Sequence, residues 1–197
     1  MSDRPLLQVQ HLSHSFPEKR GLLQQAVSSS PVLQDINLVI LPQEIVGLVG
    51  ESGCGKSTLA RLLLRIYEPT NGKILFSGED LHKYKSREYY GRVQMIFQDP
   101  FSSLNPKLKI GFLLREMWNL HQSEPSTTAK LNQLLDEVGL PANALDKYAH
   151  EFSGGQRQRI AIARALAADP EMLVADEPVS ALDVSIQAQI LNLLQQL

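Results

Sequence analysis

The stretch GESGCGKST, residues 50–58, constrains the fold of this chain more than any other. It matches the pattern G-x-x-x-x-G-K-[ST], follows the short apolar run EIVGLVG, and leads into KSTLARLLLRIY, whose leucines recur at helical spacing. We therefore expect a strand over residues 44–50, then a loop, then a helix that begins near residue 56. This arrangement predicts an α/β protein whose loop binds phosphate groups.

The residue types of the loop suit this chemistry. Glycine has no Cβ, so backbone N–H groups can come close to phosphate oxygens. Lys56 would reach the β- and γ-phosphates, Ser57 would place its hydroxyl on Mg2+, and the helix would direct its positive end toward the anion. Cys54 occupies a free position of the pattern and is interpreted as incidental to the chemistry. The nucleotide-binding residues predicted in the loop are Gly50, Ser52, Gly53, Cys54, Gly55, Lys56, Ser57 and Thr58.

A second half of the site is predicted at MLVADEP, residues 172–178, where an apolar strand ends in two adjacent carboxylates. Asp176 would help to hold Mg2+, and Glu177 would orient or deprotonate an attacking water. Gln98 ends the run MIFQ and could contact both metal and water. Taken alone, the acidic pair could be an ordinary solvated turn. Because the same chain has a phosphate loop, a functional site is the preferred interpretation. The predicted catalytic residues are Lys56, Gln98 and Glu177, and the predicted Mg2+ ligands are Ser57, Gln98 and Asp176.

Periodicity divides the rest of the chain into a β-rich part and a helical part. Strands, or short strands with their turns, are predicted over residues 6–16, 32–40, 71–81, 92–100 and 171–178. Helical periodicity begins at Lys109 and covers residues 110–120, 127–140 and 142–150. Residues 17–31 are predicted to form a surface loop. The pattern indicates a helical insertion in an α/β core.

Composition and charge exclude several classes of function. The chain has 197 residues and a net charge of −2, so it lacks the basic surface typical of nucleic-acid-binding domains, and no nucleic acid partner is expected. Cys54 is the only cysteine, so no internal disulfide can form. No apolar stretch approaches the roughly 20 residues that span a bilayer, so any contact with a membrane is expected to be peripheral.

The run EFSGGQRQRI, residues 151–160, places a second glycine pair at the start of a predicted helix. With the motifs above, it resembles the ATP-binding subunits of ABC transporters, and the resemblance covers residues 7–197. Five motifs stand in the family's order: Walker A at 50–57, the Q-loop residue Gln98, the signature FSGGQ at 152–156, Walker B at 172–176, and the SALD D-loop at 180–183.

The resemblance implies a P-loop NTPase (RecA-like) core with an N-terminal antiparallel β subdomain and an inserted helical subdomain. The whole chain, residues 1–197, would be a single ABC ATPase domain. Residues 1–98 and 166–197 would form the core with its β part, and residues 99–165 would form the helical subdomain that carries the signature.

The resemblance also explains a second glycine motif. ATPase domains of this family pair head to tail, so the signature of one protomer contacts the ATP in the phosphate loop of the other. Read alone, SGG is equally typical of a plain helix cap. ATP would join the protomers, and hydrolysis would release them. The implied contacts to the partner's ATP are Ser153, Gly154, Gly155 and Gln156, and the implied D-loop residues at the dimer interface are Ser180 and Asp183.

Within the family, MIFQDPFSSLNP and HEFSGGQRQRIAIARAL are most similar to the peptide and nickel importer branch. This implies ATP hydrolysis with Mg2+ to power uptake of oligopeptides, dipeptides or nickel, with peptide preferred. The implied partners are a second ABC ATPase subunit, two membrane permease subunits and, indirectly, a substrate-binding protein. The implied location is peripheral, at the cytoplasmic face of the plasma (inner) membrane.

Two aromatic residues have alternative interpretations. Phe16 stands where the family stacks an aromatic ring on adenine, and it could equally be a core residue at a strand end. Trp118 could pack the helical subdomain or line a groove for a membrane subunit, and packing is preferred.

The sequence departs from the family at two places. Gln43 stands where the family usually has glycine. The chain stops at Leu197, so the C-terminal part of the core, with the strand that carries the family's switch histidine, is expected to be missing. That position is taken by none of the five histidines, His11, His14, His82, His121 and His150. Three interpretations stay open: a hydrolysing importer subunit, which is preferred, a nucleotide-binding fragment without hydrolysis, and a soluble ABC ATPase with no transport role.

Overall fold

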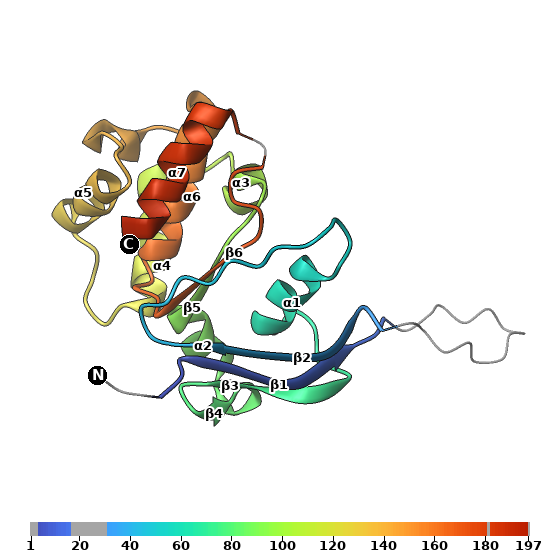
Figure 1. Ribbon diagram of the computed structural model, residues 1–197. Coiled ribbons are helices and arrows are strands. Elements are labelled where there is room, and N and C mark those ends of the chain that lie inside the picture. Colours follow the sequence, from blue (N-terminus) through green and yellow to red (C-terminus); the bar gives the residue numbers. More distant parts are fainter. Residues whose placement is uncertain (1–3, 17–30, 181, 197) are drawn as a thin grey trace, which may run out of the picture. The chain divides into compact units, whose positions relative to one another are not determined.

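The computed structural model describes residues 4–16, 31–180 and 182–196 (Figure 1). The chain forms two compact units, Met1–Lys85 and Ser86–Leu197. The loop predicted over residues 17–31 lies outside the described residues except for Pro31. Among the residues that the structure describes, no helix is both long and apolar enough to cross a membrane.

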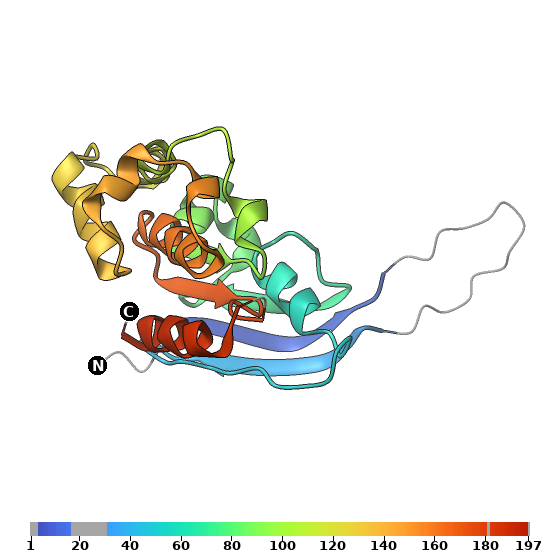
Figure 2. The same ribbon diagram turned by 90° about the horizontal axis from the view of Figure 1, so that it is seen from above.

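The first unit is built on an antiparallel sheet with the strand order β2-β1-β3-β4. Its strands are β1 (Leu7–His14), β2 (Leu33–Ile40), β3 (Asn71–Phe76) and β4 (Glu79–Asp80). Figure 2 shows β1 and β2 side by side, as their pairing requires. Leu7 and Val9 of β1 are almost fully buried, as the predicted alternation requires, and Leu12 is buried as well. The predicted N-terminal antiparallel β subdomain is therefore confirmed.

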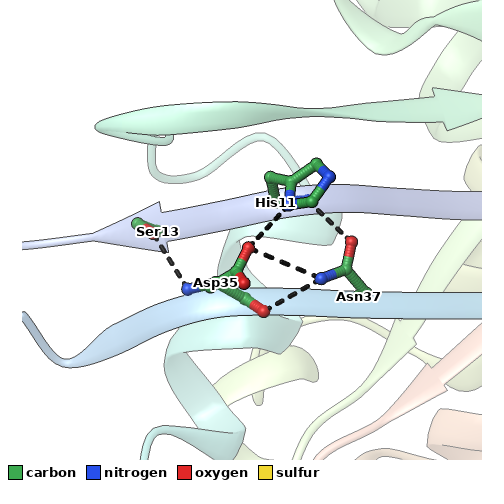
Figure 3. A network of polar contacts seen from close by, with 4 residues as sticks. All are labelled: His11, Ser13, Asp35 and Asn37. Carbon is green, nitrogen blue, oxygen red and sulfur yellow. Dashed lines mark hydrogen bonds and ion pairs between the residues drawn. The ribbon is translucent and has the colours of Figure 1, made fainter.

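A β-bulge in β1 changes which side chains face the core. The pairing of β1 with β2 shifts in register between Val9 and Leu12, and His11 has a φ of +49°. Figure 3 shows the polar contacts around it: the His11 backbone N–H donates to Asn37 Oδ1 at 2.9 Å, and His11 Nδ1 lies 2.7 Å from Asp35 Oδ1. Odd-numbered side chains are buried before the bulge, and even-numbered ones after it.

The helix predicted after the phosphate loop is confirmed as α1 (Lys56–Leu63). It buries Leu59, Ala60, Leu62 and Leu63, so the leucine spacing marks a core-facing stripe. A short 3-10 helix, η1 (Leu81–Lys83), follows β4, and the Asp80 side chain caps it by accepting from the backbone N–H of His82.

The strand predicted over residues 44–50 does not form. Residues 41–50 are exposed throughout, with Ile45 72% and Val49 fully exposed, and none of them belongs to a strand. An apolar run becomes a buried strand only where neighbouring strands pair with it. The sheet of this unit consists of β2, β1, β3 and β4, and residues 44–50 pair with none of these strands. Gln43, where the family usually has glycine, has a φ of +63°, a conformation that favours glycine.

The second unit contains a parallel pair of strands, β5 (Val93–Ile96) and β6 (Met172–Ala175), which confirms the strands predicted in those segments. The helix α2 (Ser86–Arg92) leads into β5. Arg92 ties the starts of both strands together, because its guanidinium donates to the Glu171 carboxylate at 2.5 and 2.9 Å, and its backbone carbonyl accepts from the Glu171 N–H.

The other elements of this unit are helical. They are α3 (Pro100–Ser103), α4 (Ile110–His121), α5 (Thr128–Glu137), η2 (Ala142–Asp146), η3 (Ala149–Glu151), α6 (Gly154–Leu166) and α7 (Val184–Gln196). They share an apolar core whose fully buried members include Leu114, Leu131, Leu135, Ile160 and Ile162. The helical region predicted from Lys109 onward is therefore present.

Two helical predictions need correction in detail. The predicted helix at 127–140 ends at Glu137, because Gly139 has a φ of +68° and the N–H of Leu140 bonds to the carbonyl of Leu135, which closes a Schellman turn. Residues 142–150 form no α-helix. They form the 3-10 helices η2 and η3, and the backbone at Lys147 and Tyr148 is extended between them.

Candidate nucleotide-binding site

The phosphate loop depends on glycine for its backbone path. Gly53 and Gly55 have φ values of +84° and +100°, and Gly55 is the N-cap of α1. A Cβ on Gly55 would stand 2.6 Å from Leu33 Cδ2 and 3.1 Å from the carbonyl oxygen of Val32. The conformation and the packing at Gly55 therefore both exclude a side chain, whereas nothing lies within 4 Å of a Cβ on Gly53.

Lys56 is the first residue of α1, and its side chain folds over the loop. Its Nζ donates to the carbonyl oxygens of Gly50 at 2.7 Å and Glu51 at 2.9 Å. Cys54 Sγ lies 3.8 Å from the same Nζ. The loop thus concentrates a positive charge at a helix N-terminus, which is the environment that a phosphate group requires.

Phe16 lies two residues after β1 in the same unit, and it contacts neighbouring rings while staying partly exposed. The residue is 41% exposed, and its ring centroid lies 4.8 Å from that of His14 and 5.3 Å from that of Tyr67. No sequence pattern indicates a role for Tyr67, because its contact with Phe16 joins residues far apart in the chain.

The second unit brings together residues from the Q-loop, Walker B and the D-loop. Gln98 follows β5, and its Nε2 donates to Glu177 Oε2 at 3.1 Å and to Ser180 Oγ at 3.0 Å. Glu177 follows β6 with a φ of +46°, a conformation that is rare for glutamate and is typical of constrained functional sites. Gln98 precedes Glu177 by 79 residues and Ser180 by 82, so neither strand predicts the contact by itself.

Asp176 lies at the same edge of the parallel pair. Its backbone N–H donates to the carbonyl oxygen of Ile96 at 3.1 Å, which continues the pairing of β6 with β5. Gln98 makes both of its side-chain contacts through Nε2, so a metal ion would be bound through its Oε1. A carboxylate and an amide oxygen are hard oxygen donors, which suit Mg2+.

The signature begins α6 with a complete capping box. Ser153 Oγ accepts from the backbone N–H of Gln156, and Gln156 Oε1 accepts from the backbone N–H of Ser153. Gly154 and Gly155 follow as the first helical residues. A Cβ on Gly155 would stand 2.6 Å from Ile186 Cγ2 of α7, whereas a Cβ on Gly154 would meet only Leu182 Cδ2 at 3.6 Å.

Packing against α7 therefore explains the glycine at position 155 of the signature without any ligand. No local sequence pattern predicts the contact of Gly155 with Ile186. Asp183, the last residue of the D-loop, is exposed, and its carbonyl accepts from the N–H groups of Ile186 and Gln187 at 2.9 Å each, so it begins α7.

Trp118 packs within the helical region. Its Nε1 donates to the carbonyl oxygen of Glu124 at 2.8 Å, and the Nζ of Lys130 lies 5.1 Å from the centroid of a Trp118 ring. These contacts favour packing, which is the preferred interpretation of this residue.

The phosphate loop, the helix that follows it and the acidic end of a parallel strand define a nucleotide-binding protein of the P-loop class. A sequence model described as "ABC transporter" matches residues 33–180, which is most of the chain. The chain therefore belongs to the ABC transporter family, as the resemblance implies.

Curated relatives are similar over nearly the whole chain. The oligopeptide transport ATP-binding protein OppF of Bacillus subtilis is 47% identical over 98% of this chain and 63% of its own length. The oligopeptide transport ATP-binding protein AppF of the same organism is 46% identical over 98% of this chain and 60% of its own length. The chain thus spans about three-fifths of the length of these relatives.

A solved structure has the same fold. The ATP-binding cassette MJ0796, described as dimeric and in a post-hydrolysis state bound to ADP and Pi, is 26% identical and has a TM-score of 0.77 over 95% of this chain and 81% of its own. The α/β P-loop NTPase fold that the sequence predicts is therefore confirmed.

Proposed function

We propose that this chain is the ATP-binding subunit of an ABC importer, and that it binds and hydrolyses ATP to power uptake of oligopeptides or dipeptides. The similarity to two oligopeptide transport ATP-binding proteins supports the peptide cargo over nickel. The cofactors are ATP and Mg2+. The observation that carries the proposal is the contact of Gln98 with Glu177 and Ser180 at the strand edge that also presents Asp176.

In the proposed reaction, the loop N–H groups and Lys56 bind the phosphates of ATP. Ser57, Asp176 and Gln98 Oε1 would hold Mg2+, and the ion would supply positive charge beside the phosphate oxygens. Glu177 accepts a proton from a water molecule while the water oxygen attacks the γ-phosphorus. The bond from the γ-phosphorus to the bridging oxygen breaks, and ADP and inorganic phosphate are released. Gln98 orients Glu177 through its Nε2.

The signature is proposed to complete the site of a second protomer. Ser153, Gly154, Gly155 and Gln156 would face the γ-phosphate of the partner's ATP, and Ser180 and Asp183 would lie at the dimer interface. The N-terminus of a 13-residue helix with a capped first turn suits an anion there.

The proposed assembly has a second ABC ATPase subunit, identical or different, under two membrane permease subunits, with a substrate-binding protein acting indirectly. The chain would attach peripherally to the cytoplasmic face of the inner membrane. The proposed domain remains single, residues 1–197, with a core from residues 1–98 and 166–197 and a helical subdomain at 99–165 that passes the ATP-dependent movement to the permeases.

Steady-state ATP hydrolysis by the purified chain tests the proposal, with nucleotide binding followed in the same samples and the Lys56→Ala variant as the blank. Turnover above the blank supports a working ATPase. Binding without turnover would instead favour the hydrolysis-deficient fragment. Turnover without association to membranes that contain peptide permease subunits would favour a soluble ABC ATPase.

A further inference from the structure

Three aromatic rings meet where β1 ends in the first unit. The ring of His14 lies parallel to that of Tyr67, with centroids 5.6 Å apart, and Phe16 stands nearly perpendicular to both. His14 is only 7% exposed, whereas Phe16 is 41% exposed. An accessible aromatic ring that is held by one buried and one partly buried ring is a surface on which a planar ligand can stack.

The bulge in β1 decides which way His14 faces. Because the register shifts between Val9 and Leu12, the even-numbered positions take the buried face, and His14 points toward the core. His14 Nδ1 lies 2.9 Å from the carbonyl oxygen of Glu68, next to Tyr67 in the chain. The end of β1 and the segment after α1 are therefore joined through side chains as well as backbone.

Tyr67 also connects the aromatic cluster to the helix of the phosphate loop. The guanidinium of Arg61, on α1, donates from Nη1 to the Tyr67 hydroxyl at 3.2 Å and lies 5.8 Å from the centroid of its ring. The backbone N–H of Tyr67 donates to the Arg61 carbonyl at 3.3 Å. One short helix thus carries Lys56 at its start and the residue that supports Tyr67 near its end.

We infer that Tyr67, supported by Arg61 and His14, is a positioning residue for the nucleotide base: it fixes the Phe16 ring so that base stacking is linked to α1 and its phosphate loop. The inference rests on the proposed function, in which ATP binds at the loop, and it adopts the interpretation of Phe16 as the ring that stacks on the base. A ring that is already immobilised loses less freedom when a ligand stacks on it, so the support adds affinity for the base alone.

Comparison of ATP with inorganic tripolyphosphate tests this inference, because both ligands carry three phosphates and only ATP carries a base. By calorimetry, Tyr67→Leu should weaken ATP binding about 2- to 10-fold, the range expected for loss of an aromatic pair. It should leave the affinity for tripolyphosphate unchanged. Tyr67→Phe is the matched control: it keeps the ring and should bind ATP nearly as the wild type does.

Two further variants separate positioning from a loss of folding. Arg61 is exposed, so Arg61→Gln should fold normally and reduce ATP affinity less than Tyr67→Leu, again without an effect on tripolyphosphate. In a Phe16→Ala background, Tyr67→Leu should have no further effect on ATP, because the ring that it positions is gone.

The outcomes distinguish this inference from the function on which it rests. Equal losses of affinity for ATP and tripolyphosphate would contradict the positioning role. Full ATP affinity in Tyr67→Leu, or full ATP affinity in Arg61→Gln, would contradict it as well. In each case, ATP binding by the wild type would still support the proposed function. A wild-type chain that binds neither ligand would contradict both.

Discussion

The phosphate loop and the signature turn both place glycines at the start of a helix, but the glycines are there for different reasons. In the loop, Gly53 and Gly55 adopt left-handed backbone conformations that other residues rarely take. In the signature, neither glycine is among the residues with positive φ, and only Gly155 is required by packing, because Ile186 of α7 lies against it. Gly154 has no such requirement from the described residues around it.

This difference shows which glycine carries information about function. A glycine that the backbone or the core already requires says little about a ligand. The described residues around Gly154 leave room for a side chain, so packing within the chain does not require glycine there. Contact with another molecule could require it. The proposed partner nucleotide supplies that explanation, and variants at these positions can test it.

The largest effect is expected at Glu177. Glu177→Gln should lower the rate of ATP hydrolysis about 10²- to 10⁴-fold, because the group that accepts the proton from water is lost. ATP binding should persist, so the variant should accumulate as an ATP-bound dimer, seen by size-exclusion chromatography. Glu116→Gln, on the exposed surface of α4, is the control. Wild-type turnover in Glu177→Gln would remove Glu177 as the base.

A substitution in the phosphate loop should weaken ATP binding. Lys56→Ala should reduce ATP affinity at least about 100-fold, because charge-assisted hydrogen bonds worth about 1.5–3 kcal/mol each are lost. Titration of a fluorescent ATP analogue measures it, and Lys85→Ala serves as an exposed control. Unchanged affinity would overturn the assignment of the phosphate loop.

The signature side predicts a loss of dimerisation without a loss of stability. Gly154→Asp should stabilise α6 by about 0.3–1 kcal/mol, because a carboxylate suits the first turn of a helix. In the Glu177→Gln background it should abolish the ATP-dependent dimer, because the carboxylate repels the partner's γ-phosphate. ATP binding to each separate chain should be unaffected. A dimer that persists would argue against a signature that contacts ATP.

Gly155→Ala tests whether packing against α7 requires glycine at this position of the signature. Its Cβ would force Ile186 to move, so we expect the free energy of unfolding to fall by about 1–3 kcal/mol in denaturant titration. In an Ile186→Ala background the same substitution should cost much less. If Gly155→Ala were neutral in the wild-type background, packing against α7 would not explain this glycine.

The smallest effect is expected at His121, away from both motifs. Burial, and then the charge of Arg87, lowers the pKa of His121 below its ordinary value. The folded state therefore binds fewer protons than the unfolded state, so stability should decrease as pH falls from the ordinary histidine pKa through the lowered one. His121→Gln should flatten this part of the stability profile, and Arg87→Gln should flatten it partly. An unchanged profile in His121→Gln would contradict the assignment.

Local patterns predicted much of the fold. The leucine spacing of α1 and the alternation in β1 and β2 depend on each segment's own burial, and these elements form where expected. The strand at residues 44–50 failed because a strand also needs partners, which the segment itself does not encode. Residues 142–150 failed because turns of 3-10 helix share their spacing with an α-helix over so short a segment.

The candidate site also has residues that local motifs predict and contacts that they do not. Lys56, Asp176 and Glu177 were predicted from motifs in which each residue has a chemical reason. The contact of Gln98 with Glu177 and Ser180 was not predicted, because it joins segments about 80 residues apart. The contact of Tyr67 with Phe16 and that of Gly155 with Ile186 were not predicted for the same reason, because packing partners that are distant in sequence leave no local pattern.

The most direct test of the split ATP site is turnover by an equal mixture of Lys56→Ala and Gly154→Asp chains. Each variant alone should be inactive. In a head-to-tail dimer, the mixed pair has one intact site, made from the loop of one chain and the signature of the other. Random pairing then predicts turnover on the order of a quarter of the wild-type rate. A mixture that stays at the blank, while the wild type hydrolyses ATP, would contradict a signature that serves a partner's nucleotide.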